Sequence, residues 1–170
     1  MENLIIRREE PKDYPAVRAV NASAFETPAE ANLVDVLRRE AHPVISLVAE
    51  DDGAIVGHIM FSPVSLSGYT NLKIMGLGPM AVVPKHQRKG IGSALVRAGL
   101  EKYKELAFGA VIVLGHSGYY PRFGFISSMR YGIRCEYDVP EEVFMLIELE
   151  PGHLKYASGI IKYHPAFNDV

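Results

Sequence analysis

The sequence has only one cysteine among its 170 residues, and it lacks long apolar runs. Cys135 therefore cannot form a disulfide within the chain, and no Cys or His residues stand at the spacing of a zinc site. No apolar run approaches the roughly 18 residues that a membrane-spanning helix requires. Residues Met1–Arg7 show neither the basic nor the apolar segment of a signal peptide. We therefore expect a cytoplasmic protein with no metal and no membrane partner.

An excess of one charge sign is also missing. Eighteen basic and twenty acidic side chains leave a formal net charge of −2, whereas a general nucleic-acid-binding protein shows a basic domain or patch. We therefore expect no nucleic-acid partner. The composition, 48% apolar and 22% charged, is typical of a soluble globular protein. A chain of this length corresponds to about one domain, and it needs no metal or disulfide to fold.

The first part of the chain predicts two helices and antiparallel strands. Asp13 is a predicted helix cap, and Thr27 with Glu30 has the spacing of a capping box. Gly57 inside a strand predicts a bulge or a close approach of another chain segment. The elements expected here are a strand over Leu4–Arg7, a helix from Asp13 to about Phe25, a second helix ending at His42-Pro43, and a hairpin of strands Val44–Glu50 and Ala54–Ser67.

The second part of the chain predicts one βαβ unit. Its elements are a strand over Leu77–Val83, a helix from Gly90 to about Leu106 and a continuously apolar strand over Gly109–Leu114. A helical turn near Tyr119, a strand starting at Phe125 and a strand over Val143–Leu149 follow. We therefore expect an α/β fold with a mixed, mostly antiparallel central sheet flanked by helices. Residues 1–150 are the expected domain, and residues 151–170 are a C-terminal extension packed on it.

The segment Met80–Leu95 joins a strand end, a basic loop and a glycine-rich helix start. The first N–H groups of a helix have no intrahelical partner and lie at the positive end of the helix dipole, so they suit an anion. Gly90 and Gly92 let a phosphate approach the backbone, and Arg88 and Lys89 add positive charge. The residues therefore predict a phosphate site. A second interpretation is that the glycines only shape the turn.

Two nucleotide-binding motifs do not fit this segment. The P-loop requires Gly-Lys-Ser/Thr in that order, but here Lys89 precedes Gly90. The dinucleotide fingerprint requires a third small residue where Leu95 stands. A nucleotide-binding protein is therefore only a third interpretation, and it predicts that ATP or NAD protects the protein.

At these residues the chain resembles the GCN5-related N-acetyltransferase (GNAT) family. Met80-Ala81-Val82, the following Val83-Pro84 and then Gln87-Arg88-Lys89-Gly90-Ile91-Gly92 correspond to the family's strand end, proline and Gln/Arg-x-x-Gly-x-Gly/Ala motif. The family's Tyr-x-x-x-Gly-Phe element is present as Tyr120–Phe125. The run Gly115–Phe125 is similar to a branch of mostly uncharacterised prokaryotic members. The resemblance extends from Leu4 to about Glu150.

This resemblance implies an N-acetyltransferase that uses acetyl-CoA as acetyl donor and a small-molecule or peptide amine as acceptor. It implies that the strand end pairs with the pantetheine, that backbone N–H groups hold the pyrophosphate, and that the thioester lies beside the Gly109–Leu114 strand. We further expect a homodimer. The cofactor-binding residues implied are Met80, Ala81, Val82, Gln87, Arg88, Lys89, Gly90, Ile91, Gly92 and Ser93.

The same resemblance places Tyr120 near the thioester sulfur. A tyrosine with a pKa of about 10 is protonated at neutral pH and can donate a proton to a leaving thiolate. Tyr120 is therefore the candidate general acid of a direct transfer; a covalent route through Cys135 is disfavoured because Cys135 lies outside both motifs. A second interpretation is that Tyr119 and Tyr120 only pack against the sheet. A non-catalytic acyl-CoA-binding regulatory module is the alternative function.

A general base is harder to find. Some family members carry a Glu near the start of the strand that ends at Val82, but Leu72–Val82 contains no carboxylate. The expected acceptor wall consists of the first two helices and the Ile55–Ser67 strand, and His116 is a further candidate because it could hold a water. All of these residues also have an ordinary interpretation as caps, solvated charges or structural groups. The candidates are Glu26, Glu30, Asp35, His58 and His116.

The missing base predicts a preference for amines of low pKa. Without a base, an acceptor must lose its proton to solvent before it attacks. For a lysine-like amine of pKa about 10.4 this costs roughly 4 kcal/mol at about pH 7.4, whereas an α-amino group of pKa about 7.7–8.0 costs well under about 1 kcal/mol. We expect α-amino or aminoglycoside-like amines to exceed lysine side chains in kcat/KM, measured against pH for matched acceptors. A clear preference for lysine ε-amines would imply a hidden base.

Overall fold

The computed structural model of the protein describes residues 3–170, for Tyr103 the backbone only, and the chain forms two compact units. The first unit contains the residues up to Ser62, together with Gly78–Gly99 and Pro165–Val170. The second contains Pro63–Leu77 and Leu100–His164. Each unit has its own strands and core, and three elements have one end in each. These elements are strands β3 (Ala54–Leu66) and β4 (Tyr69–Val82) and helix α3 (Ile91–Glu105).

The first unit contains an antiparallel sheet of β1 (Leu4–Arg8), β2 (Ile45–Asp51) and the first part of β3. The pairing of β2 with β3 confirms the predicted hairpin. This ladder shifts register directly after Ala49, which pairs with Gly57. A Cβ on Gly57 would lie 3.1 Å from Cγ2 of Ile91. Both the bulge and the close approach predicted at this glycine are therefore present.

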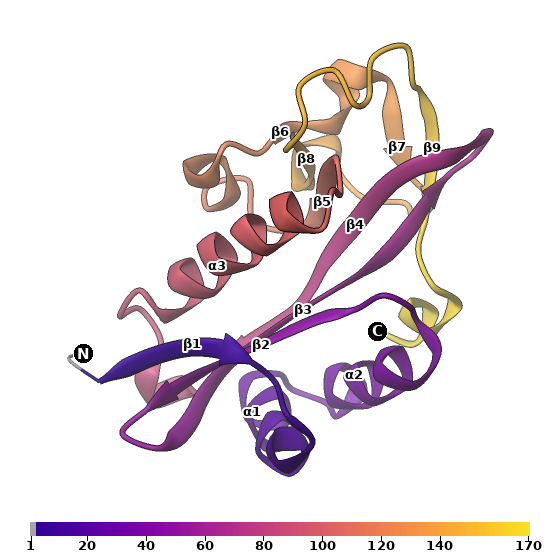
Figure 1. The fold of residues 1–170 in the computed structure, drawn as a ribbon. Helices are drawn as coiled ribbons and strands as arrows, with labels where there is room; N and C mark the ends of the chain where they lie inside the picture. Colours follow the sequence, from indigo (N-terminus) through magenta and orange to yellow (C-terminus); the bar gives the residue numbers. More distant parts are fainter. Residues whose placement is uncertain (1–2) are drawn as a thin grey trace. The chain divides into compact units, whose positions relative to one another are not determined.

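Helices α1 (Tyr14–Ala24) and α2 (Ala29–Glu40) cover one face of this sheet (Figure 1). The start of α3 covers the other face, where Gly57 and Phe61 of β3 point. The apolar stripes of α1 and α2 meet residues of β2 and β3 in one core. Its fully buried members are Val17, Leu33, Val34, Leu37, Ala41, Val48 and Met60.

The predicted helix caps are wrong. Asp13 does precede α1, but its side chain makes no cap hydrogen bond. Its carboxylate instead accepts two hydrogen bonds from the guanidinium of Arg7, at 2.7 and 2.9 Å. Helix α2 begins one residue after Pro28, so Thr27 and Glu30 do not form the predicted capping box. The Asp13 carboxylate also accepts from the Glu10 amide at 2.8 Å, in the capping box of the preceding 3₁₀ turn, and the Thr27 hydroxyl accepts from the Ala29 amide at 3.3 Å.

The second unit is built on a parallel ladder between β4 and β5 (Ala110–Leu114), which joins Ile74–Leu77 to Ala110–Val113. The predicted βαβ unit of β4, α3 and β5 is therefore confirmed. β8 (Phe144–Glu148) pairs antiparallel with β5, and β6 (Ile126–Ser127) pairs with β8. β6 is the strand expected at Phe125, shortened to two residues.

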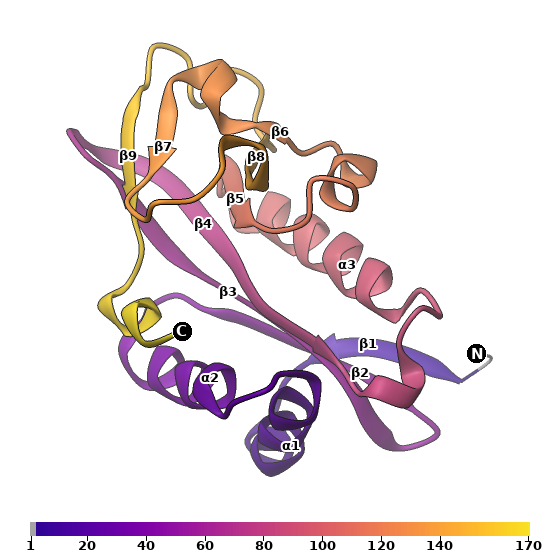
Figure 2. The ribbon, with the colours of Figure 1, turned by 180° about the vertical axis from the view of Figure 1, so that it is seen from behind.

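Two further strands of the second unit were not predicted. β9 (Gly159–Lys162) lies in the tail whose structure the sequence leaves ambiguous, and it pairs antiparallel with the end of β3. β7 (Ile133–Cys135) pairs with β9 in parallel. Figure 2 shows these two strands side by side near the end of β3 and the start of β4.

The strands are hydrogen-bonded in the order β1-β2-β3-β4-β5-β8-β6, with β9 on β3 and β7 on β9. The fold is therefore the predicted mixed, mostly antiparallel α/β fold. Within residues 3–170, no helix is long and apolar enough to cross a membrane. The short 3₁₀ helices are η1 (Pro11–Asp13), η2 (Pro84–His86), η3 (Tyr120–Phe123), η4 (Ser128–Tyr131), η5 (Glu141–Val143) and η6 (Pro165–Asp169).

The packing of α3 on β3 predicts the effect of one substitution. A Cβ on Gly99 would overlap the ring of Phe61, which is fully buried and cannot move into solvent. In Gly99→Ala, overpacking should lower the free energy of unfolding by about 1–3 kcal/mol. The higher helix propensity of alanine offsets roughly 1 kcal/mol of this loss. Urea unfolding measures the difference. Gly118→Ala is the control, because a Cβ there meets no atom within 4 Å; equal stability of the two variants would contradict the prediction.

Candidate active site

The end of β4 in the first unit carries the first group of predicted site residues. Ala81 is buried, and Met80 and Val82 are half-buried. The amide of Val83 donates to the carbonyl of Val56 at 2.9 Å, so β3 supports this strand end on one edge. The parallel ladder with β5 stops at Leu77, and β4 continues beyond it to Val82.

The loop after β4 is tied back to the strand by hydrogen bonds. The Gln87 side-chain amide donates to the carbonyl of Val82 at 2.9 Å, and the Gln87 backbone amide donates to the carbonyl of Pro84 at 3.2 Å. The backbone then turns through positive φ at Arg88 (62°) and Gly90 (87°). Such values are uncommon outside glycine, so the loop is held in one defined conformation where the sequence predicts a phosphate.

Helix α3 begins directly after this loop. The amide of Ala94 donates to the Gly90 carbonyl at 3.0 Å, and a Cβ on Gly90 would meet no protein atom within 4 Å. Arg88 and Lys89 are exposed, and neither has an ion-pair partner in the part of the chain that the structure describes. Ile91 is buried, whereas Gly92 and Ser93 are half-buried in the first helical turn. Positive charge and an open backbone therefore coincide at the helix start, as an anion site requires.

Tyr120 lies in the second unit, at the start of η3. The amides of Tyr119 and Tyr120 both donate to the carbonyl of His116, which fixes this turn directly after β5. The Tyr120 ring makes edge contacts with Tyr119 and Phe125, at centroid distances of 5.1 and 5.6 Å. A Cβ on Gly115 would overlap the Tyr120 ring, so this ring packs on the backbone at the end of β5.

Burial holds the Tyr120 hydroxyl in its protonated form. Only 8% of the residue is exposed, and burial, with a smaller effect of Tyr119, raises the pKa of Tyr120 to about 12. Among residues 3–170, no group forms a hydrogen bond with this hydroxyl. The ring therefore packs against the sheet, as the packing interpretation expected. The hydroxyl also keeps the proton that a general acid requires.

His58 is unsuited to the role of general base. It is fully buried on β3, where the Asn21 amide donates to Nδ1 at 3.1 Å and Nε2 lies 2.8 Å from the Ser46 hydroxyl. Because Nδ1 accepts, the ring proton is on Nε2 and is donated to Ser46. Burial, with a smaller contribution from Arg38, lowers the pKa of His58 to about 3. His58 is thus a neutral, hydrogen-bonded core residue.

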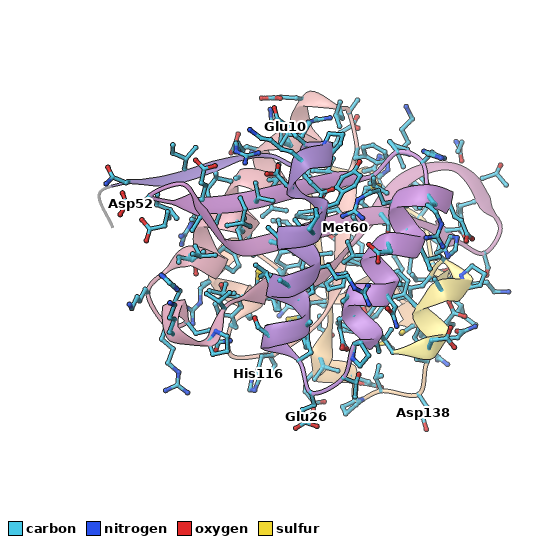
Figure 3. All side chains as sticks on the ribbon, turned by 90° about the horizontal axis from the view of Figure 1, so that it is seen from below. Glu10, Glu26, Asp52, Met60, His116 and Asp138 are labelled. Atoms are coloured by element: carbon cyan, nitrogen blue, oxygen red, sulfur yellow. The ribbon has the colours of Figure 1, made fainter. Side chains whose placement is uncertain are left out.

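The other candidate bases differ in their surroundings. Asp35 forms ion pairs with Arg18 at 2.7 Å and Arg38 at 3.0 Å. Glu26 is exposed in the turn between α1 and α2, and Figure 3 shows its side chain pointing away from the ribbon. Glu30 is half-buried in the first turn of α2. His116 is exposed, and its backbone carbonyl is what bonds to Tyr120.

Cys135 has the properties of a packing residue rather than a nucleophile. The thiol is half-buried, burial raises its pKa, and its sulfur accepts a hydrogen bond from the Tyr137 amide at 3.4 Å. A raised pKa disfavours the thiolate, which is the reactive form. Among residues 3–170, no group of three or more His, Cys, Asp and Glu side chains could hold a metal ion.

Comparison with known proteins identifies the family. Residues 6–125 match the sequence model of the Acetyltransferase (GNAT) family. The chain belongs to the GNAT family. It is 36% identical over 166 residues to the uncharacterized N-acetyltransferase YhbS of Escherichia coli K12, a match that covers 97% of this chain and 99% of YhbS. The uncharacterized N-acetyltransferase YjhQ of the same strain is 38% identical over 134 residues, covering 76% of this chain and 74% of YjhQ.

Solved GNAT structures are similar over almost the whole chain. The crystal structure of E. coli YhbS in complex with CoA has a TM-score of 0.92 at 36% identity, covering 98% of this chain and 92% of that one. A GNAT acetyltransferase of Brucella melitensis in complex with acetyl-CoA has a TM-score of 0.80 at 34% identity, covering 98% and 99%. The predicted family, fold class and enzyme class, an N-acetyltransferase, are therefore confirmed.

Two residues of this candidate site have a supporting role that sequence reasoning missed. Gln87 was expected to bind the cofactor, and its side chain also joins the loop to the end of β4. Gly115 was not considered separately, although the Tyr120 ring occupies the space where a Cβ would stand. The available signal was positional, because Gly115 ends an apolar strand and precedes the tyrosine motif by only a few residues.

The open surface at Gly90 generates a binding prediction. Gly90→Val adds a side chain where the protein has no atom, directly in front of the helix start. We expect the affinity for CoA to fall roughly tenfold or more, which corresponds to about 1.4 kcal/mol. Calorimetry on the folded variant measures this affinity.

Gly68→Val is the matched control for this experiment. Gly68 has a φ of 85°, close to the 87° of Gly90, and a Cβ on either residue meets no atom within 4 Å. The two variants therefore carry similar backbone strain, but Gly68 lies in the turn between β3 and β4. Unchanged CoA affinity in Gly90→Val, or an equal loss in Gly68→Val, would contradict a phosphate site at Gly90.

Proposed function

We propose that this protein transfers the acetyl group of acetyl-CoA directly to an amine, with Tyr120 as general acid. One observation carries the mechanism: Tyr120 is a buried residue beside the end of β5, its raised pKa keeps the hydroxyl protonated, and no described side chain or backbone group forms a hydrogen bond with that hydroxyl. Solved relatives in complex with CoA and with acetyl-CoA, at 36% and 34% identity, support the choice of donor. The acceptor is a small-molecule or peptide amine.

The backbone after β4 is suited to hold the donor. The edge of β4 that does not face β3 offers the pantetheine amides a strand to pair with, at Met80, Ala81 and Val82. The loop and first turn of α3, from Gln87 to Ser93, offer backbone N–H groups to the pyrophosphate, and Arg88 and Lys89 add positive charge. These are the cofactor-binding residues that the sequence predicted, and their role stays a proposal.

The proposed transfer needs one proton donor, which protonates the departing sulfur. The neutral amine nitrogen attacks the thioester carbonyl carbon, and the new C–N bond forms as the carbonyl oxygen takes up negative charge. The C–S bond then breaks, and the Tyr120 hydroxyl gives its proton to the departing sulfur. The proton lost by the amine returns to the tyrosinate or to solvent, so the products are an N-acetylated amine and the CoA thiol.

A tyrosine of raised pKa is consistent with this step. Burial disfavours a tyrosinate, but it equally disfavours a thiolate left in the same apolar surroundings. Proton transfer from Tyr120 therefore accompanies departure of the sulfur rather than following it. An exposed tyrosine of ordinary pKa would gain less from this coupling, because water would stabilise the thiolate.

Replacing the hydroxyl tests this mechanism. Tyr120→Phe should lower kcat by roughly 100-fold or more, the usual scale for general acid catalysis. CoA affinity and the free energy of unfolding should change little, because the lost hydroxyl has no partner among residues 3–170 and the ring packing is kept. Free thiol released from acetyl-CoA on a panel of amines gives kcat, and single-turnover kinetics establish that chemistry limits the rate.

Tyr119→Phe is the control, because Tyr119 is adjacent and also aromatic but only half-buried. Full kcat in Tyr120→Phe would make Tyr120 a packing residue. Binding of acetyl-CoA by the unmodified protein without turnover on the whole panel would instead favour the regulatory module. The division into residues 1–150 and 151–170, and a homodimer, stay predictions.

A further inference from the structure

The second unit contains a cavity of about 300 Å³ that the mechanism does not use. It lies between η4, β7 and the segment that leads from β7 through η5 to β8. Its size is at the lower end of small-molecule sites. The lining residues that matter for its chemistry are Ser128, Arg134, Asp138, Val139, Glu141 and Phe144.

This cavity lies at the same end of β5 as Tyr120. Phe144 lines the cavity and pairs with Leu114, the last residue of β5. The next residue, Gly115, donates to the carbonyl of Val143 and is covered by the Tyr120 ring. Because side chains alternate along a strand, Leu114 and Phe144 point to the face opposite to Gly115. A molecule in the cavity therefore reaches the end of β5 from the face opposite to Tyr120.

Ser128 indicates a polar ligand. Only 1% of this residue is exposed, and its hydroxyl has no hydrogen-bond partner among residues 3–170. The neighbouring Ser127 differs, because its hydroxyl accepts a hydrogen bond from the Met129 amide. Buried hydroxyls are normally paired. Ser128 is one of the residues that line the cavity, so the partner that we infer for its hydroxyl is a polar ligand atom.

Both charge signs line the same cavity. Arg134, Asp138 and Glu141 are exposed, and none of them has an ion-pair partner in the part of the chain that the structure describes. Asp138 is at the outer end of the loop, with its side chain pointing away from the ribbon (Figure 3). Glu141 starts η5, two residues before the Val143 carbonyl that bonds to Gly115. Apolar side chains, among them Val139 and Phe144, form the rest of the wall.

We propose that this cavity binds the acceptor and that the acceptor is an α-amino acid with an apolar side chain. The guanidinium of Arg134 takes the carboxylate, because its planar fork matches a carboxylate in two hydrogen bonds. Glu141 attracts the amino group toward the end of β5, Ser128 adds a hydrogen bond, and the apolar wall takes the side chain. The assignment rests on the proposed function, since the new C–N bond forms at this amino group.

Three related acceptors test the assignment: L-leucine, L-leucinamide without the carboxylate, and isoamylamine without the carboxyl group. We expect the lowest KM for L-leucine. Arg134→Gln should raise that KM roughly tenfold, the loss of one charge-assisted interaction, and leave the KM for isoamylamine unchanged. Because the KM of each acceptor is compared with the KM of the same acceptor in another variant, differences in pKa between the amines do not affect this comparison. Arg130→Gln, an exposed arginine outside the cavity lining, is the matched control and should change neither value.

Ser128→Ala separates binding from folding. It removes a hydroxyl that has no partner among residues 3–170, so Tm should not fall, whereas the KM for L-leucine should rise. Calorimetric titration of L-leucine into the CoA complex gives the same comparison without turnover. Equal KM values for the three acceptors, an equal response of leucine and isoamylamine to Arg134→Gln, or no leucine binding would overturn the assignment. If one of these results is found and the protein still acetylates other amines, the proposed function remains. If the unmodified protein does not bind CoA, the proposed function and the acceptor assignment are both wrong.

Discussion

The backbone of β4 is the constraint on which the candidate site residues of each unit depend. In the second unit its residues Ile74–Leu77 hydrogen-bond to β5 as far as Val113, and Leu114, the last residue of β5, pairs with β8. In the first unit its last residues are supported by β3, and the Val82 carbonyl anchors the Gln87 side chain. Buried backbone groups must find partners, so the strand sets the position of the loop over residues 83–90 through its own hydrogen bonds. Apart from Gln87, the loop side chains are then not needed to position the loop backbone.

Burial acts on two titratable side chains with opposite consequences for function. It favours the neutral form of both His58 and Tyr120, lowering one pKa to about 3 and raising the other to about 12. For His58 this removes its value as a switchable base, and Asn21 and Ser46 occupy both ring nitrogens. For Tyr120 the same force preserves the acidic proton, and the hydroxyl lacks a partner among residues 3–170. The hydrogen-bond partners therefore distinguish the structural group from the candidate acid.

Local signals in the sequence predicted the hairpin, the βαβ unit and the glycine-rich helix start, since turns, apolar periodicity and strand length are short-range properties. The predicted cap at Asp13 failed because its carboxylate bonds instead to Arg7, on the preceding strand, and to the Glu10 amide. β9 was not predictable, because its four residues are ordered by pairing with β3, far away in sequence. The cavity beside β8 was missed for the same reason, although the carboxylates between Cys135 and Phe144 were visible. The hydrogen bonds that make His58 a core residue also come from other elements, α1 and β2, so the sequence around His58 could not predict them.

The charges of the cavity bear on how an amine becomes reactive without a dedicated base. A carboxylate such as Glu141 draws an ammonium group in, but it also stabilises the charged form and so raises the amine pKa. A guanidinium such as Arg134 acts on the amine in the opposite direction while it binds the carboxylate of the same acceptor. Opposite charges that line one small cavity can therefore supply binding energy and leave the amine pKa close to its solution value. A cavity lined only by carboxylates would bind amines more strongly and hold them in the unreactive form.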